Sequence, residues 1–179
     1  MAFCYEIVAA PELATDQPAI GEATPTPSVA PSDAPQRSSY SSCRVDGPYI
    51  AMTFDDGPHP VLTPRLLDML KARGIKATFF LIGQNAAEYP GIVRRIAAEG
   101  HEIGNHTWNH PQLTKLNPAA LREEIERTSS TIAEIIGKPL LVMRPPYGAT
   151  SDYINHWINR EFGMKVILLV RGSARLEIS

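Results

Sequence analysis

The sequence predicts an α/β protein whose parallel strands form a β/α barrel, or part of one. Short apolar runs alternate with helical patterns between residues 49 and 168, and strands that alternate with helices typically pair in parallel. No glycine-rich dinucleotide-binding fingerprint follows the first predicted strand, which disfavours an open nucleotide-binding sheet. In a β/α barrel, the residues that follow the carboxyl ends of the strands converge on one face and form the active site.

Apolar runs bounded by turn residues predict the strands. The first run comes directly before two aspartates. The predicted strands are Tyr49–Phe54, Ala77–Ile82, His101–Gly104, Leu140–Met143 and Met164–Leu168.

Helices are predicted where end signals bracket an apolar stripe. Thr63 is the expected N-cap of the first helix, with Pro64 at its first helical position, and Asn117 is the expected cap of the longest. A glycine follows each predicted helix, as is common after a last helical turn. The predicted helices are Thr63–Arg73, Pro90–Glu99, Pro118–Ile136 and Thr150–Phe162.

Residues 1–47 are predicted to form a disordered segment or linker ahead of the domain. The stretch GEATPTPSVAPSDAPQRSSYSS is rich in Pro, Ser and Thr and has no apolar periodicity, as is typical of an extended, solvated chain. Such linkers often join an exported catalytic domain to an envelope anchor, so we expect an envelope or secreted location. The opening residues, MAFCYEIVAAPELA, lack the basic start and long apolar core of a signal peptide.

Composition limits the function classes. The formal net charge of -2 gives no support to binding of nucleic acid or of an anionic membrane. The longest apolar runs, such as Val166–Val170, are far too short to span a bilayer. Both cysteines, Cys4 and Cys43, precede the predicted domain, which therefore has no cysteine for a metal site or a disulfide. Two separate thiols are favoured over a bridge between them.

Three predicted strands are each followed by side chains that can do chemistry. Asp55 and Asp56 follow the first strand, His106 and His110 the third, and Arg144 the fourth. All of them come at the carboxyl ends of their strands, on the face where a β/α barrel builds its active site. This common placement is the strongest argument from the residues themselves that the chain has a catalytic site.

The spacing His106-x-x-x-His110 places both imidazoles on one face of a helical turn, within reach of one ion. Alone, the spacing favours two solvated loop histidines. An acidic pair on the same face favours a metal site instead, because one carboxylate and two histidines leave open positions for water and substrate, as a catalytic zinc requires. Cobalt or manganese suits the same ligands. The zinc-protease pattern His-Glu-x-x-His is not met.

The two aspartates are expected to have different roles. One would bind the metal, and the other, held by the cation and by Arg144, would stay ionised and remove a proton from water. Without these neighbours, DDGP is an ordinary turn sequence and Arg144 a surface arginine. The prolines after Arg144 leave few free amides, so the N–H of Tyr147 is a candidate donor. Its ring alternatively packs at the barrel rim.

Other residues near these motifs have simpler interpretations. Trp108 is expected either to cover the metal loop or to serve as a sugar platform. His59 is expected near the site without binding the metal. The charged residues of the longest helix are expected to form a solvated face, and they are Arg122, Glu123, Glu124, Glu126 and Arg127.

Three ordered stretches resemble the first motifs of a known family. They are Thr53-Phe54-Asp55-Asp56-Gly57, His106-Thr107-x-x-His110 and Arg144-Pro145-Pro146-Tyr147. Over residues 48–168 the chain resembles the polysaccharide deacetylase family, which is carbohydrate esterase family 4 or the NodB-homology domain. The resemblance implies a distorted β/α barrel with a divalent metal, often zinc.

The resemblance also implies roles for the site residues. Asp55 would be the catalytic base, Arg144 would hold it, and the N–H of Tyr147 would stabilise the oxyanion. The metal ligands would be Asp56, His106 and His110. The chain would use metal-activated water to remove acetyl groups from an N-acetylated polysaccharide, such as a chitin oligosaccharide or peptidoglycan, at a carbon–nitrogen bond that is not a peptide bond. The acetylated polymer would be its partner, and the chain is expected to be a monomer.

The sequence departs from the family pattern after Leu168. The family's later Asp/Trp-rich motif, and its Leu-x-His segment with the general acid, are not found in residues 169–179. We expect this tail to be aberrant, and a shifted reading frame near Leu168 is compatible with the missing motif. The domain over 48–168 is therefore expected to be partial at its C-terminus. The alternatives are an inactive fragment that binds only metal or glycan, an O-acetyl (acetylxylan) esterase, or an unrelated metallohydrolase on a similar barrel.

Overall fold

The computed structural model describes residues 3–7, 37–42 and 50–169. They form an α/β fold around a seven-stranded sheet with the order β1-β3-β4-β5-β6-β7-β2. The strands are β1 (Phe3–Ile7), β2 (Ser39–Tyr40), β3 (Ala51–Gly57), β4 (Thr78–Leu81), β5 (Glu102–Asn105), β6 (Val142–Met143) and β7 (Lys165–Ile167). The helices are α1 (Leu62–Ala72), α2 (Gly83–Glu88), α3 (Pro90–Ala98), α4 (Pro118–Ile136) and α5 (Asp152–Phe162), with 3-10 turns η1 (Leu113–Lys115) and η2 (Pro146–Gly148).

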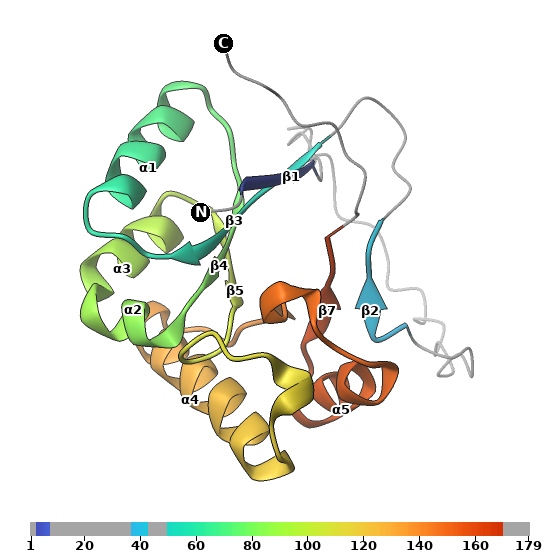
Figure 1. Ribbon diagram of the computed structural model, residues 1–179. Coiled ribbons are helices and arrows are strands. Elements are labelled where there is room, and N and C mark those ends of the chain that lie inside the picture. The colour runs from blue at the N-terminus through green and yellow to red at the C-terminus, as the bar shows by residue number, and fades with distance from the viewer. Residues whose placement is uncertain (1–2, 8–36, 43–49, 170–179) are drawn as a thin grey trace, which may run out of the picture.

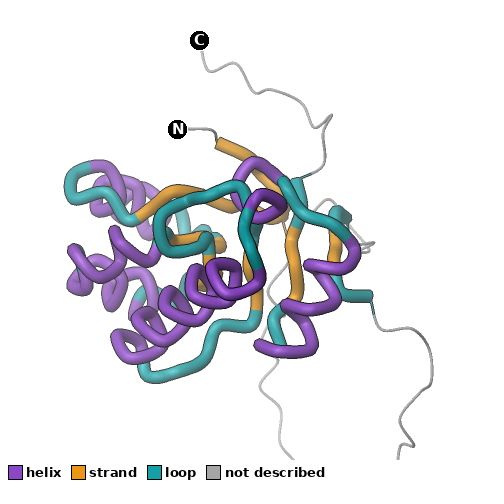
Figure 2. Tube along the Cα trace, turned by 60° about the horizontal axis from the view of Figure 1, so that its bottom comes forward, coloured by secondary structure: helices purple, strands orange, loops and turns teal. Residues whose placement is uncertain are grey.

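The sheet is parallel through its centre. From β3 to β7, each strand pairs in parallel with the next one along the chain. The helices lie in an arc around the outside of the curved sheet (Figure 1), and the turned view in Figure 2 shows the same arrangement. Parallel strands joined through outer helices confirm the predicted α/β class.

Both edge strands of the sheet come from the N-terminal region, which the sequence predicts to be disordered over residues 1–47. β1 pairs with β3 in antiparallel fashion, and β2 pairs with β7 in parallel. The structure differs from the prediction at these two strands, because pairing with an open sheet edge can order a segment that has no apolar periodicity of its own. Residues 8–36, Cys43 and the tail from residue 170 lie outside the described residues.

One apolar core joins the sheet to the helices. The strand side chains Phe79 and Met143 and the helix side chains Ile96, Ile125 and Ile132 are each at most 2% exposed. Burial of an apolar stripe against the sheet is what holds an amphipathic helix in place. Among the described residues, none of the helices combines the length and the apolar character that crossing a bilayer requires.

The ends of α4 form as the sequence predicts. Asn117 Oδ1 accepts a hydrogen bond from the N–H of Ala120 at 2.9 Å, and this satisfies an amide that the helix itself leaves unpaired. At the other end, Gly137 adopts a left-handed φ of 74°, which costs little without a Cβ.

The first two helices differ from the prediction. α1 begins at Leu62, with Val61 in the cap position. Thr63 is not the cap, because it lies inside the helix and its Oγ1 accepts the N–H of His59 at 2.8 Å. α2 is not predicted from the sequence, because it has 6 residues and no side-chain cap and is too short to show an apolar stripe.

Replacing Ile132 with Ala is expected to lower the free energy of unfolding by about 2–5 kcal/mol, because it leaves a cavity beneath α4. Leu141→Ala is the control, since Leu141 is 62% exposed, and it should change that free energy by less than about 0.5 kcal/mol. Urea denaturation followed by circular dichroism measures both variants. Equal losses in the two would contradict the core described above.

Candidate metal centre

The two adjacent aspartates are turned apart at the end of β3, which runs past its predicted end at Phe54. The register of β3 against β4 shifts here, and Asp56 has a φ of 69°, in a region that residues other than glycine seldom adopt. Such a shift re-aims the side chains of a strand. Asn85 Nδ2 donates to the Asp56 carbonyl at 3.1 Å. Asp55 consequently meets Arg144, while Asp56 faces the histidines.

His106 follows β5 and is held in one tautomer. Its side chain is buried, and its Nδ1 lies 2.6 Å from the backbone carbonyl oxygen of Arg144. A carbonyl can only accept, so Nδ1 carries the hydrogen. The lone pair of a neutral His106 is therefore on Nε2, the nitrogen that faces Asp56. An outer partner that fixes the tautomer in this way is typical of a metal-binding histidine.

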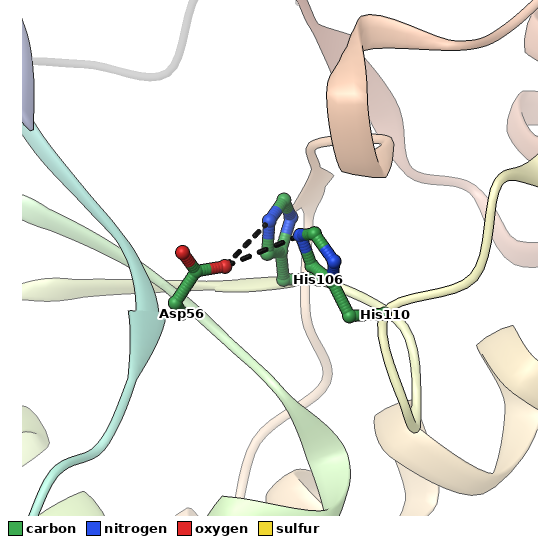
Figure 3. A group of neighbouring side chains, drawn as sticks. All are labelled: Asp56, His106 and His110. Carbon is green, nitrogen blue, oxygen red and sulfur yellow. Dashed lines mark ion pairs between the residues drawn. The ribbon is translucent and has the colours of Figure 1, made fainter. Parts of the chain in front are cut away.

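Three ligand atoms converge on one point. Asp56 Oδ1 lies 3.4 Å from His106 Nε2 and 3.2 Å from His110 Nε2, as Figure 3 shows. The candidate ligand atoms all lie within 4.8 Å of one another. Asp56 Oδ1 is buried and has no hydrogen-bond partner among the described residues. The carboxylate oxygen of Asp56 and the lone pair on His106 Nε2 repel each other unless a positive charge lies between the two atoms. This donor set therefore fits a divalent cation.

The charges at the centre favour metal binding. The neighbouring His106 imidazole lowers the pKa of Asp56, against the opposing effect of burial. Burial lowers the pKa of His110, and the nearby His106 adds to this. A metal needs an ionised carboxylate and neutral imidazoles, and these shifts favour the ionised form of Asp56 and the neutral form of His110.

Arg144 connects the acidic pair to the rest of the centre. Its side chain is 2% exposed, and Nη1 donates to Asp55 Oδ1 at 2.9 Å and to Thr53 Oγ1 at 2.7 Å. The guanidinium carbon also lies 4.2 Å from the ring centroid of Phe80. This contact with an aromatic face is attractive to a cation in a buried position. Asp55 is thereby fixed beside the three ligands without joining them.

Tyr147 lies at the mouth of the centre. It has a φ of 60°, its side chain is exposed, and its ring meets the ring of His110 edge-on with centroids 4.7 Å apart. The ring therefore lies at the rim and contacts one of the candidate ligands. The ring borders a depression of about 250 Å³, lined by Asp55, Asp56, His106, His110, Arg144, Pro145, Tyr147, Gly148, Leu168 and Leu169.

One local prediction is wrong. The segment from His106 to His110 is a loop and not a helical turn, since Thr107 and His110 have φ values of 68° and 64°. Trp108 packs beneath Arg127, whose guanidinium carbon lies 3.7 Å from the ring centroid, and it does not line the depression at the candidate ligands. His59 lies near the site as predicted, in a pocket that Asp55 and Asp56 also line, and its Nδ1 accepts the N–H groups of Val61 and Leu62.

Two contacts of the site have no counterpart in the sequence analysis. Thr53 accepts from Arg144, although its place in the first motif is a signal that could have revealed it. Glu124 of α4 accepts two N–H groups from the histidine loop. No spacing rule connects a helix position to a loop so far away in the sequence.

The fold and the site together define an α/β protein with a candidate metal centre at the carboxyl ends of its strands. A sequence profile described as "Polysaccharide deacetylase" matches residues 43–167. The chain belongs to the polysaccharide deacetylase family.

Named relatives agree with this assignment. The chain is 45% identical over 119 residues to a peptidoglycan-N-acetylglucosamine deacetylase of Bacillus cereus, covering 64% of this chain and 43% of the relative. It is 42% identical over 123 residues to a chitin deacetylase of Pestalotiopsis sp, covering 67% of this chain and 41% of the relative. The chain thus spans less than half the length of these relatives.

A solved structure matches in three dimensions. The Bc1960 peptidoglycan N-acetylglucosamine deacetylase, in complex with a benzamide derivative, aligns with a TM-score of 0.63 and 43% identity. The match covers 65% of this chain and 54% of that one. The distorted β/α barrel fold implied by the sequence motifs is therefore confirmed for the matched part.

In the metal-free protein, the His110 ring protons are expected to titrate with a pKa below the ordinary value of 6.5, because burial penalises the protonated ring. The unfolded chain takes up the proton near pH 6.5 and the folded chain only at lower pH. Acidification through this window therefore destabilises the folded state.

Proton NMR against pH measures this titration, with His110→Gln to assign the resonance and the urea-unfolded protein as the reference. A His110 midpoint equal to that of the unfolded chain, or above it, would contradict the burial argument.

Proposed function

We propose that this chain carries the metal site and the base of a polysaccharide N-deacetylase, a hydrolase of carbon–nitrogen bonds other than peptide bonds. The observation that carries the proposal is the placement of Asp55, fixed by Arg144, beside the ligand set of Asp56, His106 and His110. Zinc is the ion that best suits one carboxylate and two imidazoles with open positions, and cobalt or manganese is the alternative.

The geometry supports the following roles for the residues of the centre. A cation bound by the three ligands would acidify a water molecule and polarise the acetyl carbonyl. Asp55 would accept a proton at Oδ2, because Oδ1 is already bonded to Arg144 Nη1. The hydrogen bond from Arg144 keeps Asp55 aimed until that transfer. The N–H of Tyr147, at the edge of the depression, is the proposed donor to the oxyanion.

The proposed substrate is an N-acetylated polysaccharide, either a chitin oligosaccharide or peptidoglycan. The names of the relatives support both polymers. Tyr147 has 70% of its surface exposed at the mouth of the depression, and an exposed aromatic ring can pack against the apolar face of a sugar. Acetylxylan, with an O-acetyl group, is the alternative substrate.

A second candidate function is binding of metal or glycan without turnover. Both histidines that line the depression are assigned to the metal, so the described lining of the depression offers no further imidazole to protonate a leaving amine. A deacetylase needs such an acid for efficient cleavage of the carbon–nitrogen bond. The first test below separates the two candidates.

The zinc-loaded protein is expected to release acetate from N-acetylated chito-oligosaccharides, and a chelator should abolish the release by removing the ion that activates water. Acetate is measured with a coupled enzymatic assay, and added zinc should restore the signal. A folded, zinc-loaded sample that releases no acetate from chito-oligosaccharides or from peptidoglycan would favour the binding function over the hydrolase.

Asp55→Asn is expected to lower turnover by at least about 10²-fold, because it removes the proton acceptor. It should leave zinc affinity within about threefold, since Asp55 is not a ligand. His106→Ala is the contrasting variant and should lose both zinc binding and turnover. Acetate release and zinc titration are measured on the same samples. An active Asp55→Asn protein would refute the assignment of the base.

A further inference from the structure

The loop that carries His110 has an unusual backbone, in which Thr107 Oγ1 accepts the N–H of His110 at 3.2 Å. Thr107 and His110 both have left-handed φ values, 68° and 64°, although neither is a glycine. Residues in this region persist only where the surrounding structure fixes them. The position of the His110 imidazole therefore depends on whatever holds the loop backbone.

Two helices hold the loop. The N–H groups of Gly83 and Gln84 at the start of α2 donate to the carbonyls of Thr107 and Trp108, at 2.9 and 3.0 Å. A carboxylate oxygen of Glu124 in α4 accepts the N–H groups of Trp108 and Asn109. The two peptide units between Thr107 and Asn109 are thus each paired to both helices.

The Glu124 contact reaches the residue next to His110. Its Oε2 accepts the N–H of Trp108 at 2.9 Å and that of Asn109 at 3.1 Å. Asn109 directly precedes His110, so the bond fixes the peptide unit between Trp108 and Asn109, one residue before the ligand. Hydrogen bonds to an ionised carboxylate are about twice as strong as neutral ones.

The loop is also packed tightly between these helices. A Cβ built on Gly83 would lie 2.5 Å from Trp108 Cε3 and 2.5 Å from Thr128 Oγ1. Arg127 covers the ring of Trp108 from α4. Little free space remains around Trp108. A loop released by Glu124 would therefore shift at its other end, where His110 lies.

We propose that Glu124 is a positioning residue, which sets the place of the His110 imidazole through the backbone of the loop. Glu124 is half-buried, whereas its neighbours Glu123 and Glu126 are exposed. The solvated face predicted for this helix is therefore wrong at position 124. The inference rests on the proposed metal site, and it concerns how that site is built.

Zinc affinity tests the role. Glu124→Ala removes the acceptor and should weaken zinc binding by about 10-fold or more, the usual effect of losing an outer partner of a metal ligand. Glu124→Met, which keeps the length and helix preference of the side chain, should do the same and serves if the Ala variant folds poorly. Glu124→Gln keeps one oxygen that can accept both N–H groups, so it should retain affinity within about threefold. Glu126→Ala is the matched control on the same helix and should have no effect.

Zinc dissociation constants come from competition with a chromophoric chelator, and the visible spectrum of the cobalt(II)-loaded protein reports ligand geometry. A positioning role predicts an altered cobalt spectrum in Glu124→Ala and Glu124→Met but not in Glu124→Gln. An unchanged constant and spectrum in both Glu124→Ala and Glu124→Met would overturn the proposal, as would an equal loss in Glu126→Ala.

The result that would overturn the proposed hydrolase function differs from the result that would overturn the role of Glu124. A wild-type protein that binds no zinc would overturn both proposals. Zinc binding without acetate release would overturn only the hydrolase, because the affinity comparison still decides the role of Glu124.

Discussion

The buried guanidinium of Arg144 is the interaction on which the centre depends. A cation that is 2% exposed is costly unless it is paired, and its partner here is Asp55, with Thr53 as the second acceptor. The same residue contacts the other half of the centre, because its backbone carbonyl fixes the tautomer of His106. One position after β6 thus orients both the proposed base and a ligand.

The parallel topology makes this arrangement possible. Because β3, β5 and β6 run in the same direction, their carboxyl ends meet at one edge of the sheet, and residues 38 to 89 positions apart in the sequence come into contact there. The strands alone do not complete the site. The register shift at the end of β3 separates the two aspartates, and α2 and α4 hold the histidine loop from outside the sheet.

Much of this could be predicted from the sequence. Alternating strands and helices predict the parallel sheet, and placement after strands brings Asp55, Asp56, His106, His110 and Arg144 to one end. The loop geometry could not be predicted, because the left-handed φ of His110 depends on partners far away in the chain. The contact of Glu124 with the loop could not be predicted for the same reason. Helical periodicity shows which face of the helix is polar, but not which polar side chain contacts a loop 15 residues away.

The side-chain and backbone contacts of Arg144 respond differently to a substitution. A substitution at position 144 deletes the guanidinium and its bond to Asp55, but the backbone carbonyl that faces His106 remains whichever residue stands there. The support of the proposed base is therefore encoded in a side chain, whereas the orientation of the candidate ligand is encoded in the path of the backbone. The two halves of the centre can for this reason change independently of each other.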